Sequence, residues 1–137
     1  MIEFKELINE AINARNYAYI PYSNFAVGAA LLTESGKIYK GCNIENASFT
    51  PTNCAERTAV FKAVSEGERS FKAIAVVGGK INEEVSEYIT PCGVCRQVLA
   101  EFCGEDFIII SAKSETDYKV YTLKDLFPGS FSKESVL

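Results

Sequence analysis

The sequence has 137 residues, a net charge of −4 and no histidine. Its length predicts one domain over residues 1–137, in which residues 132–137 have the character of a loose tail. The acidic balance argues against nucleic acid as a partner, and the lack of any apolar stretch of about 18 residues argues against a membrane span. The absence of histidine excludes serine-histidine and cysteine-histidine catalysis and every metal site that needs an imidazole.

The first half of the chain alternates between helical and extended patterns. Apolar residues recur at helical spacing over Phe4–Tyr17, which predicts an amphipathic helix that ends before Pro21. The nearly continuous apolar run Phe25–Thr33 and the segment Lys37–Cys42 predict the two strands of a β-hairpin. A polar stretch then leads into a predicted helix over Cys54–Glu66.

The second half continues the alternation with shorter elements. We expect a buried strand over Lys72–Val77, a helix over Cys92–Phe102 and a β-branched strand over Phe107–Ile110. An edge strand over Asp117–Tyr121 and a helical turn over Leu123–Leu126 follow. Helices that alternate with strands are typical of parallel strands joined by crossovers. We therefore expect an α/β fold, a three-layer α/β/α domain with a mixed sheet of about five strands.

The cysteines are the first candidates for chemistry, and they are Cys42, Cys54, Cys92, Cys95 and Cys103. The amino-terminal residues lack the pattern of a secretory signal, so we expect a cytoplasmic protein whose cysteines serve metal binding or catalysis more readily than disulfides. The stretch Pro91-Cys92-Gly93-Val94-Cys95 places C-x-x-C at the start of a helix. Taken alone, this motif leaves metal ligation, redox chemistry and packing open.

Cys54 favours metal ligation, because it also lies at the start of a predicted helix. Successive right-handed crossovers bring helix N-termini to the same edge of a sheet, so the sulfurs of Cys54, Cys92 and Cys95 can meet there. The unpaired N–H groups at helix starts stabilise thiolates, which are the form that binds metal. Three thiolates suit Zn²⁺ and leave its fourth position for water, which predicts a catalytic site.

Charged and polar residues beside these cysteines are candidates for the remaining roles. Glu56 lies in the same helical turn as Cys54, where a carboxylate can move protons for a metal-activated water; the alternative is a glutamate that only complements the helix dipole. Arg57 can offset the excess negative charge of three thiolates, and the alternative is a solvated surface arginine. Arg96 and Gln97, directly after Cys95, are candidates for the same role beside the sulfurs.

These motifs resemble those of a known family. C-A-E at one helix start and P-C-G-V-C at the next are similar to the zinc-dependent nucleoside and nucleobase deaminases, here in a three-cysteine form. Three further stretches resemble the small, tetrameric bacterial type of cytidine deaminase, namely Tyr22–Ala30 (YSNFAVGAA), Gly41–Asn46 (GCNIEN) and Pro128–Phe131 (PGSF). The resemblance runs from near the amino terminus to Phe131.

The resemblance implies a hydrolase acting on cytidine and 2′-deoxycytidine in pyrimidine salvage. It implies one Zn²⁺ per chain, with Cys54, Cys92 and Cys95 as ligands and Glu56 as proton shuttle. It also implies that water attacks C4 of the cytosine ring and that ammonia leaves. Two alternatives stay open: a deaminase of another aminopyrimidine nucleoside, and a zinc-binding module without catalysis. A polynucleotide deaminase is disfavoured by the acidic charge.

The resemblance also implies how the nucleoside is bound. The implied substrate-binding residues are Phe25, Asn43, Glu45, Ala55, Thr90 and Phe131. Asn43 and Glu45 are implied to bind the ribose hydroxyls, Phe25 to pack on the pyrimidine, and the Ala55 N–H and the Thr90 carbonyl to contact the base. An aromatic like Phe131 reaches into a neighbouring subunit's site in tetrameric members, which implies a homotetramer with shared active sites. Arg57 matches the position implied to hydrogen-bond the zinc thiolates.

The segment after Asn46 departs from the expected pattern. Phe49 stands where we expect tyrosine, which puts a hydroxyl hydrogen bond at that position in doubt, and Thr52 stands where some relatives carry another cysteine. Cys42 and Cys103 match no ligand position, and we assign them to packing.

Overall fold

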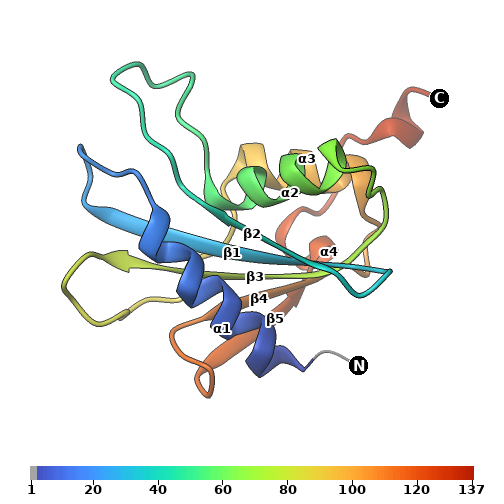
Figure 1. Cartoon of the computed structure of the whole chain (residues 1–137). Helices are drawn as coiled ribbons and strands as arrows, with labels where there is room; N and C mark the ends of the chain where they lie inside the picture. Colours follow the sequence, from blue (N-terminus) through green and yellow to red (C-terminus); the bar gives the residue numbers. More distant parts are fainter. Residues whose placement is uncertain (1–2) are drawn as a thin grey trace.

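Helices cover both faces of one five-stranded sheet in the computed structural model, which describes residues 3–137 (Figure 1). The helices are α1 (Phe4–Ala14), α2 (Ala55–Ser65), α3 (Gly93–Phe102) and α4 (Leu123–Leu126), with 3₁₀ turns at Arg15–Tyr17 and Lys133–Ser135. The strands are β1 (Phe25–Thr33), β2 (Ile38–Cys42), β3 (Phe71–Lys80), β4 (Ile108–Ala112) and β5 (Tyr118–Thr122). The predicted three-layer α/β/α fold with a mixed five-stranded sheet is confirmed.

The strand order is β2-β1-β3-β4-β5. β1 pairs antiparallel with both β2 and β3, β3 pairs parallel with β4, and β4 pairs antiparallel with β5. β2, β3 and β4 therefore run in the same direction, although β1 separates the first two. Because α2 follows β2 and α3 follows β3, both helices begin beyond the carboxyl ends of these strands, at one edge of the sheet.

Two boundaries differ from the prediction. The first helix ends at Ala14 and continues only as a 3₁₀ turn, and β3 extends to Lys80 instead of ending at Val77. Gly78 and Gly79, which follow the predicted end of this strand, pair with β1, Gly78 opposite Val27 and Gly79 opposite Ala26. The predicted loose tail contains the 3₁₀ turn Lys133–Ser135.

The two faces of the sheet carry separate hydrophobic clusters. One lies under α1 and includes Leu7, Ile8 and Ala11; the other lies under α2 and α3 and includes residues such as Ala59 and Leu99. Figure 1 shows α1 on one side of the sheet and both α2 and α3 on the other. None of the helices within residues 3–137 is long and apolar enough to cross a membrane.

The close approach of α2 to β2 requires a glycine. A Cβ atom added at Gly41 would lie 2.5 Å from the backbone nitrogen of Ala59 and closer still to the carbonyl oxygen of Ala55. Both atoms belong to the helix backbone, which no side-chain rotation can move aside. Gly41 thus allows the first turn of α2, which follows Cys54, to rest directly on the strand.

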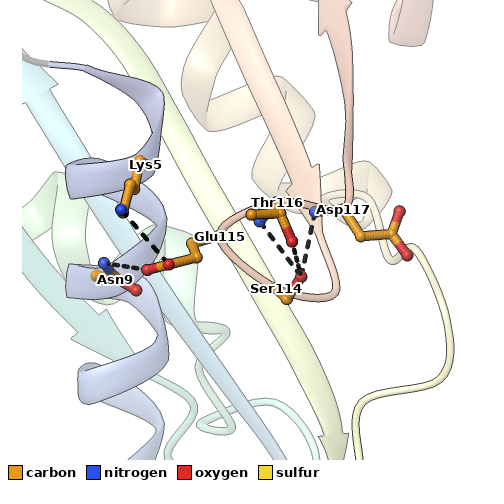
Figure 2. A network of polar contacts seen from close by, with 6 residues as sticks. All are labelled: Lys5, Asn9, Ser114, Glu115, Thr116 and Asp117. Atoms are coloured by element: carbon orange, nitrogen blue, oxygen red, sulfur yellow. Dashed lines mark hydrogen bonds and ion pairs between the residues drawn. The ribbon is translucent and has the colours of Figure 1, made fainter.

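The turn between β4 and β5 is tied to α1. The Glu115 carboxylate accepts a hydrogen bond of 2.8 Å from Asn9 Nδ2 and lies 3.6 Å from Lys5 Nζ (Figure 2). Within the turn, Ser114 Oγ accepts hydrogen bonds from the backbone N–H groups of Thr116 and Asp117. This turn lies at the carboxyl end of β4, the sheet edge at which α2 and α3 begin.

Candidate metal centre and active site

Three cysteine sulfurs meet where α2 and α3 begin. Cys54 and Cys92 are the N-cap residues of α2 and α3, and Cys95 lies in the first turn of α3. The Cys54 and Cys92 sulfurs are 3.6 Å apart, those of Cys92 and Cys95 are 3.4 Å apart, and all three lie within 4.8 Å of one another. Sulfurs around a tetrahedral Zn²⁺ with Zn–S bonds of about 2.3 Å are about 3.8 Å apart. The donor set therefore fits zinc in both chemistry and spacing.

The number of ligands favours an open site. Within residues 3–137, no carboxylate or fourth cysteine joins this group of three. A closed structural zinc site has four protein ligands, whereas three leave one position for water or substrate. The Cys54 sulfur also sets this site apart from a redox dithiol, which needs only the C-x-x-C pair. The predicted meeting of the three sulfurs is confirmed.

The thiols of Cys54 and Cys95 differ in how readily they ionise. The pKa of Cys54 is lowered to about 5, because Cys95 hydrogen-bonds to its sulfur and Arg57 donates to it as well. The same hydrogen bond with Cys54 raises the pKa of Cys95, and burial raises it further. Cys54 therefore ionises more readily than Cys95, and a metal ion must displace the proton that Cys95 retains in order to bind both sulfurs.

Arg57 lies against the sulfur cluster. Its Nη2 atom donates a hydrogen bond of 3.3 Å to Cys54 Sγ. Its Nε atom is buried and has no hydrogen-bond partner within residues 3–137. A guanidinium in this place offsets thiolate charge and restrains the sulfur that it contacts.

Replacing Arg57 with methionine should weaken zinc binding about 10-fold to 100-fold, as expected when a group that orients a ligand is lost. Without this donor the pKa of Cys54 rises, so more protons must leave at pH 7 when the metal binds. Titration calorimetry of zinc into the metal-free protein, in two buffers of different ionisation enthalpy, measures the zinc affinity and the number of protons released. Equal affinity and equal proton release in the two proteins would contradict this role.

Glu56 is buried in the first turn of α2, with 4 % of its surface exposed. Burial raises the pKa of its carboxyl to about 7, and the negative charge of Cys54 contributes to the rise. A carboxyl that titrates near neutral pH can both accept and return a proton under ordinary conditions. A glutamate that only complemented the helix dipole would remain exposed, so its burial supports a chemical role.

The segment before Cys92 is fixed by Arg96. Its Nε donates to the Pro91 carbonyl at 2.7 Å, its Nη2 to Thr90 Oγ1 at 2.9 Å, and its Nη1 to the Leu126 carbonyl at 2.5 Å. These three contacts join the start of α3 to the end of α4. Arg96 acts on the chain that carries Cys92, and within residues 3–137 its side-chain hydrogen bonds go to oxygen atoms and not to a sulfur.

Gln97, which we expect beside the sulfurs, has a hydrogen bond to another part of the chain. Its Nε2 atom donates instead to the carbonyl oxygen of Phe131, at 2.8 Å. An α-helix turns about 100° per residue, so Gln97 projects about 200° around α3 from Cys95. Gln97 thus holds the carboxyl-terminal segment that carries Phe131, whose side chain is 63 % exposed.

Asn43 has a structural contact that the sequence does not disclose. Its Nδ2 atom donates to the Phe25 carbonyl at 2.8 Å, and its Oδ1 atom accepts from the Val27 N–H at 2.9 Å. The amide thereby fixes the start of β1, including the half-buried Phe25. One N–H of Asn43 and one lone pair of its oxygen stay available for a ligand.

Glu45 organises the turn before β1. Its Oε1 atom accepts hydrogen bonds from the backbone N–H groups of Tyr22 and Ser23, at 3.0 and 3.2 Å. The Ser23 hydroxyl and these N–H groups hold the pKa of the Glu45 carboxyl below its usual range. These contacts favour the ionised carboxylate.

The remaining predicted residues lie in different surroundings. Ala55 is fully buried at the start of α2, and Phe49 is 93 % exposed. Burial raises the pKa of Cys42 and raises that of Cys103 to about 12, as expected for packed thiols outside a metal site. Neither cysteine belongs to the metal-binding group.

Comparison with known proteins identifies the family. The family model for the cytidine and deoxycytidylate deaminase zinc-binding region matches residues 1–111. The chain is 51 % identical over 135 residues to a cytidine deaminase of Sporosarcina psychrophila, covering 98 % of this chain and 96 % of that protein. It is 50 % identical over 130 residues to the cytidine deaminase of Halalkalibacterium halodurans, covering 95 % of each.

A solved structure agrees with the sequence relatives. The crystal structure of cytidine deaminase from Burkholderia pseudomallei superposes with a TM-score of 0.86 at 46 % identity, covering 95 % of this chain and 100 % of that one. The three-cysteine centre described above lies within the residues that the family model matches. By its sequence, its fold and its zinc-binding cysteines, the chain belongs to the cytidine and deoxycytidylate deaminase family.

Proposed function

We propose that this chain hydrolyses cytidine and 2′-deoxycytidine to uridine and 2′-deoxyuridine, with release of ammonia. The observation that carries this proposal is the buried Glu56 carboxyl, two residues after Cys54, beside an open group of three sulfurs. The names of the relatives at about half identity support the choice of substrate.

The proposed chemistry needs a metal and a proton carrier. A zinc ion held by Cys54, Cys92 and Cys95 supplies the Lewis acidity that makes water nucleophilic near neutral pH. Glu56 takes a proton from the attacking water as the C4–O bond forms and delivers it to N3 of the ring. It then moves the second proton of that water to the amino group, as the C4–N bond breaks and ammonia leaves. Arg57 keeps Cys54 ionised and in place throughout.

In this proposal the substrate is held by groups from four segments: the start of β1, the residues after β2, the start of α2 and the connection before α3. The free N–H of Asn43 and the second oxygen of Glu45 bind the ribose hydroxyls, because together they supply both a donor and an acceptor. The Phe25 ring packs on the pyrimidine. The N–H of Ala55, at the first position of α2, has no acceptor within the helix and is available to the base, as is the Thr90 carbonyl.

The proposal extends to assembly and location. A homotetramer, with Phe131 contributing to a neighbouring active site, would cover an aromatic side chain that is 63 % exposed in the single chain. The cytoplasm suits the site because three reduced cysteines are required, and that compartment keeps thiols reduced. Pyrimidine salvage is the process that uses this reaction.

The direct test follows the absorbance of cytidine and the release of ammonia, with zinc measured per chain. We expect turnover that stops when a chelator removes zinc and returns when zinc is added. Zinc near one per chain without ammonia release would favour a module that only binds metal. Turnover confined to other aminopyrimidine nucleosides would favour the alternative substrate, and dithiol exchange that persists without metal would favour redox chemistry.

A further inference from the structure

We propose that Arg96 and Ser111 form a clamp on residues 89–91 that positions the Thr90 carbonyl and the Cys92 sulfur. The two side chains approach the segment from different elements, Arg96 from α3 and Ser111 from β4. Both are positioning residues, because they act through the backbone of the segment. The part of the inference that concerns Thr90 rests on the proposed function, because it assumes that the Thr90 carbonyl contacts the base. The part that concerns the Cys92 sulfur does not depend on the proposed function.

The clamped segment needs support from outside itself. Residues 81–92 connect β3 to α3 and form no helix or strand. A connection of this kind has none of the regular hydrogen bonds that hold a helix or sheet in one conformation. Yet its last residues include Thr90, implied to contact the base, and Cys92, one of the three sulfur ligands. Their placement must therefore come from contacts with the surrounding fold.

Ser111 supplies the first contact. It lies on β4 near the carboxyl end, opposite Val76 of β3, and is fully buried. Its hydroxyl donates to the Ile89 carbonyl at 2.5 Å. The Ile89 side chain reaches over Gly78 of β3, where an added Cβ atom would collide with Cδ1 of the isoleucine. Backbone and side chain of Ile89 are thus both held against the sheet.

Arg96 supplies the second contact, on the next two residues. Its hydrogen bonds to Thr90 Oγ1 and to the Pro91 carbonyl fix one side-chain atom and one backbone atom on adjacent residues. The proline ring also fixes the backbone φ angle at Pro91. The third hydrogen bond, to the Leu126 carbonyl, anchors the guanidinium itself.

The pattern of occupied and free carbonyls indicates what the clamp is for. The carbonyl oxygens of Ile89 and Pro91 both accept hydrogen bonds from the clamp. The carbonyl oxygen of Thr90, between them, accepts none within residues 3–137. A peptide group held on both sides and left unpaired is a preorganised acceptor, which suits recognition of an amino group on a bound base.

The test compares Arg96→Met and Ser111→Ala with two matched controls. Arg69→Met removes an arginine that also donates to two backbone carbonyls, those of Val64 and Glu68, on an exposed part of the chain. Thr33→Val removes a hydroxyl that is likewise buried, at the end of β1, where it accepts a hydrogen bond from the backbone N–H of Lys37. The measurements are kcat and KM for cytidine, melting temperature, and the rate at which zinc passes to a chromogenic chelator.

We expect the clamp variants to raise KM about tenfold or more, with a smaller change in kcat, because the acceptor is misplaced. Zinc should pass to the chelator about tenfold faster, because Cys92 loses its support. The controls should change both quantities less than about twofold, whatever their melting temperatures. A conservative Ser111→Cys variant, which retains a weak donor, should fall between Ser111→Ala and the unchanged protein.

Two results would overturn the inference. Clamp variants that melt earlier but keep KM and zinc transfer at the level of the controls would show a purely structural role. Controls that match the clamp variants in KM and zinc transfer would show a general effect of lost stability. If Arg96→Met does not fold, the test is made with Ser111→Ala and Ser111→Cys. The rate of zinc transfer can be measured without turnover. If the proposed function is wrong, the protein without any substitution will fail to deaminate cytidine, and this result is distinct from the outcome for zinc transfer.

Discussion

Replacing Glu56 with glutamine should remove most deamination while the protein keeps its zinc. The amide has nearly the shape of the carboxyl but cannot carry a proton between water and the leaving group. General acid-base catalysis contributes about 10²-fold to 10⁴-fold to rates, so we expect a loss of kcat in this range. The three sulfur ligands lie on other residues and are left unchanged.

We would test this prediction by measuring the zinc content per chain and kcat on the same preparation. The matched control is Glu66→Gln, which makes the same change at the exposed end of α2 and should leave both quantities unaltered. Loss of zinc in Glu56→Gln would place the carboxylate among the metal ligands. Full turnover would remove it from proton transfer.

Replacing Gly41 with alanine should displace the first turn of α2 and disturb the metal centre without touching any of its residues. The new methyl group would collide with the backbone of Ala55 and Ala59, which lie on the first two turns of the helix. Overpacking of this kind costs about 1 to 3 kcal/mol of unfolding free energy, and more where backbone must move. Cys54, the N-cap of the same helix, moves with it.

The outcome is measured as melting temperature and as zinc retained after dialysis against a weak chelator. Gly104→Ala is the control, because a Cβ atom there meets no atom within 4 Å. We expect a lower melting temperature and loss of zinc only for Gly41→Ala. A variant that melts normally and keeps its zinc would show that α2 can shift without moving Cys54.

The meeting of the three sulfurs was predictable because it depends on chain order. Cys54 and Cys92 begin helices that follow strands of the same direction, and right-handed crossovers place such helix starts at one sheet edge. The length of β3 was not predictable in this way. Gly78 and Gly79 have the local character of a turn, but pairing with β1 keeps them in the strand.

Side-chain contacts from distant segments were beyond the reach of the sequence. Ser111 looks like an ordinary strand residue, and nothing near it in the chain points to the Ile89 carbonyl. Gln97 follows a ligand in the sequence, yet helical rotation turns it toward Phe131. Such contacts depend on the positions that distant loops and strands adopt in the folded chain, which local sequence patterns do not encode.

The hydrogen bonds of Asn43 explain why an amide is required there even before any substrate binds. Its side chain imitates a peptide group: it donates to the Phe25 carbonyl and accepts from the Val27 N–H, so it extends the pairing of β1 past the end of β2. The main chain is then free to leave the sheet toward Cys54. Aspartate has the same shape, but it would set a carboxylate oxygen against the Phe25 carbonyl oxygen, two acceptors with no hydrogen between them. The isosteric exchange would therefore damage both strand termination and the ribose binding that we propose for Asn43.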